Sequence, residues 1–321
     1  MGRRFLGLCA VGMEVLAFGP KLVRAENVTT SAQAWDLGAS ITPRSLALAG
    51  GDLAVGASTS SAFGNPSGLL LSRAYEVEAM ATWAPEAGFS QYGAAIADSM
   101  TSKIAGAFAG QRTDFTTARL ARTAIDLRAS MAVPFGDSLS LGVAGRWLRT
   151  EDRPGSGATA GEAVANSGAQ RTRMAFDVGL VIHPVPAFRL GFVARNLFAT
   201  PSFDLPRILA GGVGVTLDAL TVESTALVDL TVPEVPRWRS STGLEWSASE
   251  RYAVRFGYRF DEGHRTHSIG FGVAIFDRAG ALETSVRRDI AGPWPATFVT
   301  LGLRALMNSP GQGDGGGSGS M

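Results

Sequence analysis

The sequence predicts an all-β fold, a transmembrane antiparallel β-barrel of about fourteen strands with an N-terminal plug-like segment. Apolar and polar residues alternate in many successive segments of about ten residues, the length with which a tilted strand crosses a bilayer. No later run of apolar residues is long enough for a transmembrane helix. The 321-residue chain also holds 40 glycines and only 18% charged residues, which suits a barrel in contact with lipid.

The clearest alternation lies at 251–260. Successive side chains of a strand point to opposite faces, so this segment has one apolar face and one cationic face. A soluble sandwich would bury the apolar face, whereas an outer-membrane barrel would turn it to lipid and the arginines to the lumen. The apolar face holds Tyr252, Val254, Phe256, Tyr258 and Phe260, and the other face holds Arg251, Ala253, Arg255, Gly257 and Arg259.

The same pattern recurs along the chain, with short Pro-, Gly-, Asp- or Asn-containing turns between segments. Tandem sandwiches would also contain many strands, but their strands average about five or six residues. No segment of helical period interrupts the series, which excludes a parallel α/β fold. The expected strands are 74–84, 89–98, 103–111, 123–133, 140–147, 174–182, 188–196, 208–217, 220–230, 239–246, 251–260, 268–276, 282–286 and 297–306.

The stretch 151–172 breaks the alternation and is rich in Gly, Ala and Ser. Barrels carry their longer loops on the outer side, so we expect this stretch to be an outer loop. A linker between two domains is the alternative, but strands of the same type resume after it.

The N-terminus indicates export. A basic start, Met1-Gly-Arg-Arg4, precedes a mostly apolar run, and Val23-Arg-Ala25 offers a signal-peptidase site before Glu26. Glu14 interrupts the apolar run, and a buried N-terminal helix is the alternative. The single cysteine, Cys9, lies in the predicted signal peptide 1–25, so the mature chain would contain no thiol. The Gly/Ser-rich segment 307–321 is expected to be a disordered tail.

The segment before the first strand is not a period-two strand. It reads Arg44, Leu48-Ala-Gly-Gly51, Leu53-Ala-Val55, then small residues to Ala62, then Asn65-Pro-Ser-Gly-Leu69. This order resembles the opening segment of barrels in the FadL-like superfamily, in particular its PorV/PorQ-type branch. Ser67 stands where those barrels usually have alanine, and Ala49 is an insertion. Ala194-Arg-Asn-Leu197 resembles a strand end of the same family, and the stretch that begins Leu205-Pro-Arg resembles a strand start.

The resemblance implies a plug or hatch segment at 26–73 and a transmembrane barrel at 74–306. It also implies that the plug packs inside the barrel. The plug-motif residues are Arg44, Gly50, Gly51, Asn65, Pro66 and Gly68.

If large apolar residues face lipid, charged residues of both signs face the lumen. One interpretation is a lumen held together by ion pairs, and the other is a polar substrate path whose arginines favour an anionic head group such as a carboxylate. The polar faces hold the acids Glu76, Glu78, Asp126, Asp177, Glu223, Asp229, Glu245 and Glu283 and the arginines Arg128, Arg146, Arg189, Arg195, Arg239, Arg255, Arg259 and Arg304. The candidate lumen-lining residues are Glu76, Glu78, Arg146, Arg195, Glu245, Arg255, Arg259, Glu283 and Arg304.

Aromatic residues gather near the expected strand ends. Amphipathic rings at that depth are typical of the interfacial girdles of membrane barrels, and a buried core in a soluble barrel is the alternative. The lipid bilayer is therefore an expected partner. These residues are Trp83, Trp147, Trp238, Trp246, Trp294, Tyr75, Tyr252 and Tyr258.

Enzyme signatures are nearly absent, and we expect neither catalysis, nor a cofactor, nor a metal. His264 and His267 flank a turn without the spacing or further ligands of a metal site, and His183 ends a strand. The net charge of +1 gives no footprint for nucleic acid.

Three functions fit these expectations. The first is a channel or transporter for hydrophobic or amphipathic small molecules, gated by the plug. The second is a non-transporting barrel partner of a secretion or surface-assembly system, as in PorV-like proteins. The third is a secreted soluble β-protein that binds a ligand. The first two place the protein in the outer membrane of a Gram-negative bacterium.

Overall fold

The computed structural model describes residues 42–118, 120–159, 168–199, 202, 204–231, 236–293 and 295–307. The predicted signal peptide, the first part of the predicted plug, Trp294 and nearly all of the predicted tail lie outside these residues. Fourteen antiparallel strands form a closed barrel in which β1 pairs with β14, so the predicted fold class and strand number are confirmed. The strands are β1 Tyr75–Ala84, β2 Phe89–Asp98, β3 Ala105–Thr116, β4 Leu120–Phe135, β5 Leu139–Pro154, β6 Ala169–Val185, β7 Phe188–Leu197, β8 Ile208–Leu217, β9 Leu220–Asp229, β10 Arg237–Ser249, β11 Tyr252–Asp261, β12 Thr266–Asp277, β13 Gly280–Ala291 and β14 Thr297–Leu306.

Several strands are longer than the sequence pattern indicates. The predicted loop 151–172 is only 155–168, because β5 and β6 continue and pair up to Asp152 and Ala169. The expected strand 282–286 is the middle of the longer β13. In both cases polar residues continue the alternation after the apolar ones stop.

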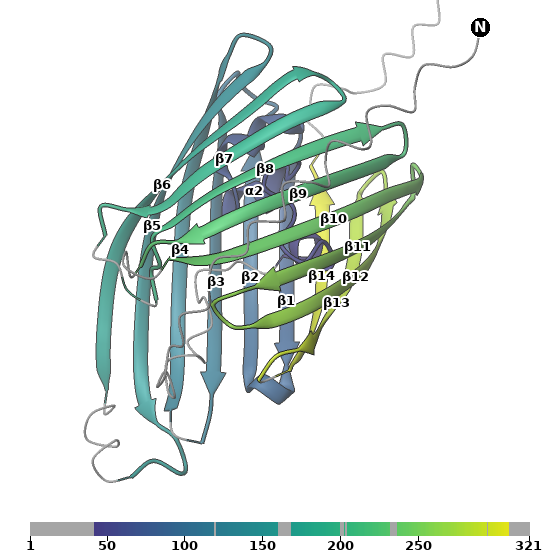
Figure 1. Ribbon diagram of the computed structural model, residues 1–321. Helices are drawn as coiled ribbons and strands as arrows, with labels where there is room; N and C mark the ends of the chain where they lie inside the picture. The colour runs from purple at the N-terminus through teal and green to yellow at the C-terminus, as the bar shows by residue number, and fades with distance from the viewer. Residues whose placement is uncertain are drawn as a thin grey trace, which may run out of the picture. The chain divides into compact units, whose positions relative to one another are not determined.

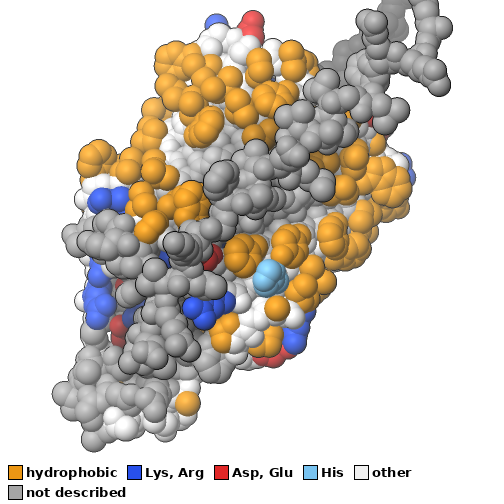
Figure 2. Space-filling model, in the orientation of Figure 1, with side chains coloured by type: hydrophobic (Ala, Val, Ile, Leu, Met, Phe, Trp, Pro, Cys, Tyr) orange, Lys and Arg blue, Asp and Glu red, His pale blue; other side chains and the backbone are white. Residues whose placement is uncertain are grey.

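The distribution of apolar and polar side chains is the reverse of that in a soluble protein. Phe108 and Met174 are each 69% exposed on the outside, whereas Glu78 is 1% and Glu223 2% exposed inside the barrel. Figure 2 shows hydrophobic side chains spread over the visible face of the strands. An apolar outer surface around a charged interior is what a lipid-facing barrel requires.

The two ends of the barrel differ. One end, here the long-loop end, carries the connections 85–88, 117–119, 155–168, 198–207, 230–236, 262–265 and 292–296. The other, the short-turn end, carries 99–104, 136–138, 186–187, 218–219, 250–251 and 278–279 and both chain ends of the barrel. Among the described residues, no helix is long and apolar enough to span a membrane.

The helical elements before β1 lie inside the barrel (Figure 1). They are α1 Pro43–Ala47, α2 Ser58–Phe63 and the 3-10 helix η1 Pro66–Leu71, and a further 3-10 turn, η2 Pro85–Ala87, connects β1 to β2. The residues 42–73, here called the plug segment, contact strands all around the barrel, from α1 against β11–β14 to η1 against β3–β6. The plug segment therefore occupies the lumen.

Candidate functional site: a plugged lumen with an arginine-lined cavity

The first turn of the plug segment is fixed by its own sequence. Thr42 caps α1 by accepting a hydrogen bond from the backbone N–H of Ser45 at 3.1 Å, and Pro43 occupies the first helical position. The helix ends at a tight turn, in which Ala49 and Gly50 adopt φ values of 53° and 90°. Gly50, a predicted plug-motif residue, supplies the conformation that this turn needs. The neighbouring Gly51 packs against the backbone of Gly243 in β10.

Asn65 organises the second half of the plug segment. Its side-chain oxygen accepts hydrogen bonds from the backbone and hydroxyl of Ser67, and its amide donates to the carbonyls of Leu53 and Leu180. Pro66 begins η1, and a Cβ on Gly68 would lie 2.4 Å from the carbonyl oxygen of Gly56. The Asn-Pro-Ser-Gly motif thus shapes the plug and ties it to β6. Ser67 adds a hydrogen bond that alanine could not make.

Barrel-wall side chains hold the plug segment by its main chain. Glu223 in β9 accepts hydrogen bonds from the backbone N–H groups of Ala54 and Val55. Glu78 in β1 accepts one from the hydroxyl of Thr59. Because these side chains are buried, their hydrogen bonds to the plug replace the hydrogen bonds to water that they lose on burial and so stabilise the docked state. Four more wall side chains donate to plug carbonyls: Arg128 to Phe63, Ser140 to Ser67, Ser241 to Ala49 and Ser285 to Pro43.

Glycines in the wall allow the plug to approach the strands closely. A Cβ on Gly142 of β5 would lie 2.2 Å from the backbone nitrogen of Ser67, and one on Gly179 of β6 would lie 2.0 Å from Asn65 Oδ1. Both distances are far below van der Waals contact, so no larger residue fits with the plug docked. Other inward glycines that touch the plug segment are Gly191, Gly212, Gly214, Gly243, Gly257, Gly270, Gly272 and Gly302.

A chain of ion pairs, here called the charge network, runs along the wall on the short-turn side of the plug. It begins in the plug, where Arg44 Nη1 lies 3.1 Å from Glu245 Oε2. It continues through Arg255, which is 2.5 Å from both Glu245 and Glu283, to Arg304, 2.8 Å from Glu283. Arg304 also faces Glu76 and Glu78 at 3.9 and 4.0 Å. Since Glu78 binds Thr59, the network starts and ends on the plug.

The charge network contains seven of the ten charged residues predicted for the plug motif or the lumen: Arg44, Glu76, Glu78, Glu245, Arg255, Glu283 and Arg304. The other three predicted lumen residues lie elsewhere. Arg146 pairs with Asp126 at 2.8 Å across β4 and β5, next to Arg128. Arg195 and Arg259 line a cavity on the opposite side of the plug.

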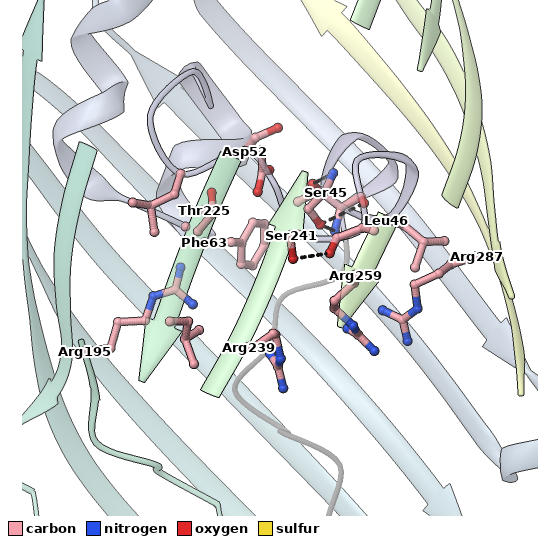
Figure 3. A pocket seen from close by; sticks show the side chains of 17 residues that line it. Ser45, Leu46, Asp52, Phe63, Arg195, Thr225, Arg239, Ser241, Arg259 and Arg287 are labelled. Carbon is pink, nitrogen blue, oxygen red and sulfur yellow. Dashed lines mark hydrogen bonds between the residues drawn. The ribbon is translucent and has the colours of Figure 1, made fainter. Parts of the chain in front are cut away.

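That cavity, here called the arginine cavity, lies between the plug and the half of the barrel nearer the long-loop end. Arg195, Arg239, Arg259 and Arg287 line it from β7, β10, β11 and β13. Figure 3 shows these side chains along one side and Asp52 of the plug on the other. Its volume of about 100 Å³ holds a head group or several waters, but not a whole long-chain molecule.

Two wall carboxylates partly neutralise the positive charge of these arginines. Asp261 lies 2.8 Å from Arg239, and Asp289 lies 3.8 Å from Arg287, whose guanidinium stacks over the Phe298 ring at 4.2 Å. Burial raises the pKa of the Asp52 carboxyl, and nearby Arg44 and Arg195 oppose that rise. Planar guanidinium groups bind carboxylates and similar oxyanions well. The cavity is therefore suited to an anionic or strongly polar head group.

The histidines take no part in this site. His264 contacts Asp261 at 3.0 Å in the β11–β12 turn, and His267 on the outer face of β12 hydrogen-bonds to Tyr258 at 2.6 Å. Among the described residues, no group of three His, Cys, Asp or Glu side chains could hold a metal ion.

Two features of the site escaped the sequence analysis. Arg287 was beyond the end of the expected strand 282–286. One alternation continues through the inward positions Glu283, Ser285, Arg287 and Asp289. Following this alternation in the sequence identifies Arg287 as an inward residue. The role of the wall glycines depends on which residues the plug touches, and the sequence alone does not contain that information.

Comparison with known proteins places the chain by its fold. Neither a family model nor a curated protein matches the sequence. Among solved structures, the Ralstonia pickettii toluene transporter TbuX matches with a TM-score of 0.64 and 12% identity, covering 84% of this chain and 98% of TbuX. A Pseudomonas aeruginosa FadL homologue matches with a TM-score of 0.60 and 12% identity, covering 81% of this chain and 97% of the homologue. The P. putida toluene transporter TodX matches with a TM-score of 0.57 and 8% identity, covering 83% of this chain and 98% of TodX. The predicted resemblance to FadL-like barrels is thus confirmed for the fold, and the PorV/PorQ-type branch stays a prediction.

Proposed function

We propose that the protein is an outer-membrane channel for hydrophobic or amphipathic small molecules, gated by its plug. The observation that carries the proposal is the closed barrel with an apolar outside and a polar lumen filled by a docked segment. A structural protein needs no internal segment with a cavity above it, whereas a selective channel needs both a barrier and a binding site. The solved structures of similar fold include two toluene transporters, which supports the same substrate class.

In this proposal the chain has four parts. Residues 1–25 are a cleaved signal peptide, 26–73 the plug, 74–306 the transmembrane barrel and 307–321 a tail. The bilayer contacts the apolar outer surface, and the organism is Gram-negative. The long-loop end faces outward, because outer-membrane barrels carry longer loops outside and short turns in the periplasm.

The arrangement of the site suggests an order of events. A molecule enters from the long-loop end and reaches the arginine cavity, where an anionic or polar group is held. The cavity is too small for the whole molecule, so onward passage requires part of the plug segment to yield. The charge network on the other side of the plug keeps ions and water-soluble solutes from leaking through.

A second function is a non-transporting partner of a secretion or surface-assembly system. The observation in its favour is that ion pairs and the plug fill the lumen, as a purely structural barrel would allow. Such a partner would be expected to offer several large outer loops for docking. At the long-loop end, however, only the connections 155–168 and 198–207 have ten or more residues. The two functions differ in whether hydrophobic molecules cross the membrane at all.

The test is uptake of radiolabelled toluene by intact Gram-negative cells that lack other channels of this kind. Intact cells are needed because toluene crosses plain phospholipid freely, whereas the lipopolysaccharide leaflet slows it. We expect the protein to fractionate with the outer membrane, to migrate differently on gels before and after heating, and to speed uptake. A correctly folded barrel that leaves uptake at the level of cells without it would favour the second function.

A further inference from the structure

One sector of the inner wall differs from the rest in carrying no charge. The inward faces of β2 and β3 hold Phe, Gln, Gly, Ala and Thr residues, and among the described residues these strands form the one adjacent pair without an inward charge. Towards the short-turn end this sector becomes almost pure alanine. The alanine patch consists of Ala95, Ala97, Ala105, Ala107 and Ala109 of β2 and β3 and Ala132 of β4, all at most 6% exposed.

The plug faces this patch with apolar side chains. Ala62 and Phe63 of α2 and Leu69 of η1 are buried in one cluster with the alanines, and Leu70 packs against it. An alanine side chain has no polar atom, so its contact with the plug depends on dispersion and hydrophobic burial alone. On the charged sectors the plug is held instead by buried carboxylates and guanidinium groups, and one of these, Arg128, donates to the carbonyl of Phe63 at the edge of the patch.

The apolar contact between plug and patch connects two cavities. Phe63 belongs both to this contact and to the lining of the arginine cavity. Leu70, at its other end, lines a second cavity of about 170 Å³ near the short-turn end, together with Lys103, Pro134 and His183. The contact surface between Ala62–Leu70 and the alanine patch is here called the alanine seam. It reaches from one side of the plug to the other.

We propose that the alanine seam is the passage of this channel and that it admits uncharged, compact hydrocarbons such as an aromatic ring. This inference rests on the proposed transport function and specifies its route and substrate class. An apolar molecule that enters the seam replaces apolar contacts with apolar contacts. Passage through the charged sectors would instead separate buried ion pairs or uncover charges in an apolar medium, which is costly. The seam thus narrows the substrates of the proposed channel, because a molecule whose anionic group is held in the arginine cavity goes no further.

The experiment compares toluene uptake by intact cells that express three variants. Ala107→Leu fills the seam, Leu70→Ala widens it, and Ala253→Leu is the control, since Ala253 is an equally buried inward alanine on β11 beside the charge network. Folding of each variant is checked by outer-membrane fractionation and by the shift in gel migration on heating. Uptake of a small sugar is measured in parallel, because a displaced plug would admit it.

We expect Ala107→Leu to slow toluene uptake about tenfold, which corresponds to about 1.4 kcal/mol added to the barrier. We expect Leu70→Ala to speed it without admitting sugar, and Ala253→Leu to leave it within about twofold of the unchanged protein, a difference of under about 0.5 kcal/mol. Equal effects of Ala107→Leu and Ala253→Leu, or no effect of either seam variant, would show that the seam is not the passage. Transport by the protein would still be established. If Ala107→Leu does not fold, Leu70→Ala alone decides. If the unchanged protein does not speed uptake, both the proposed transport function and the proposed passage are refuted.

Discussion

Glu223 on the barrel wall accepts a hydrogen bond from the backbone N–H of Val55 in the plug at 3.1 Å, and its other oxygen binds the N–H of Ala54. The wall therefore binds the main chain of the plug, so this interaction depends little on which side chains the plug carries at these two positions. Since both partners are buried, the interaction contributes to the stability of the docked state and not only to its geometry.

Glu223→Gln should weaken plug docking. Glutamine can still accept one hydrogen bond, but its amide group cannot accept the second, so one buried N–H loses its partner. We expect the free energy of unfolding to fall by about 1–3 kcal/mol. Urea unfolding in detergent, followed by the change in gel migration, measures this. Glu250→Gln in the exposed β10–β11 turn is the control, and an equal loss in both variants would argue against a special role for Glu223.

Gly179→Ala should displace the plug. The added Cβ would lie 2.0 Å from Asn65 Oδ1, and the strand backbone cannot retreat without breaking its ladder. We expect a folded barrel that leaks small sugars. Gly106→Ala, where a Cβ meets nothing within 4 Å, should leave the sugar barrier intact. A Gly179→Ala barrel that remains sealed would show that the docked plug in this region can shift at little cost.

Arg304→Met should destabilise the barrel through the charge network. It leaves Glu283 and Glu78 with fewer buried counter-charges, a situation that costs about 3–5 kcal/mol. Adding Glu283→Gln should restore part of the loss, because one of the uncompensated charges is then gone. Strict additivity of the two changes in urea unfolding would contradict the coupling of these residues.

Asp52→Asn should change how stability depends on pH. Burial raises the pKa of Asp52 above 3.8, so the folded state holds this proton more tightly than the unfolded chain does. That contribution is fully present below the unfolded pKa and is lost as pH rises through the folded pKa. Arg44, Arg195 and Arg255 lower the pKa and so reduce the effect, and Glu223 lies close enough to be coupled to Asp52.

The asparagine variant stays neutral at every pH. We therefore expect it to be more stable than the unchanged protein at pH 8 and to lose that advantage towards pH 4, as measured by thermal midpoints in detergent. An advantage that grows in acid would have the wrong sign.

The barrel could be predicted from the sequence because the alternation of apolar and polar residues in a strand is a local pattern. Tyr252, Phe256 and Tyr258 alternate with small and charged residues within one strand, and no distant residue is needed to interpret them. The extent of the strands was harder, because at Arg149 and Arg171 polar residues continue a strand above the apolar band. There the ladder partner, not hydrophobicity, decides where a strand ends.

The site could be predicted only in part. Arg44 and Asn65 belong to a motif that can be seen in sequence, and both contact the wall. The pairing of Arg255 in β11 with Glu283 in β13 depends on both strands flanking β12 and on the register of each. The alanine patch is a further case: Ala97 and Ala107 look unremarkable in a list of alternating residues and gain meaning from the plug that covers them.

A disulfide between plug and wall shows most directly whether the plug stays anchored while molecules pass. An ideal Cβ at Gly212 of β8 lies 3.5 Å from Cβ of Leu53 in the plug, within the range of about 3.5–4.5 Å in which disulfides form. The pair Leu53→Cys and Gly212→Cys, in a Cys9→Ser background, would therefore lock the plug to the wall on the side away from the alanine seam.

Toluene uptake by intact cells is then measured with the disulfide formed and after its reduction. We expect the same rate in both states, because only the seam has to yield, and we expect Ala107→Leu in the same background to slow uptake. Uptake that stops on oxidation and returns on reduction would contradict it and would mean that the whole plug must leave the lumen.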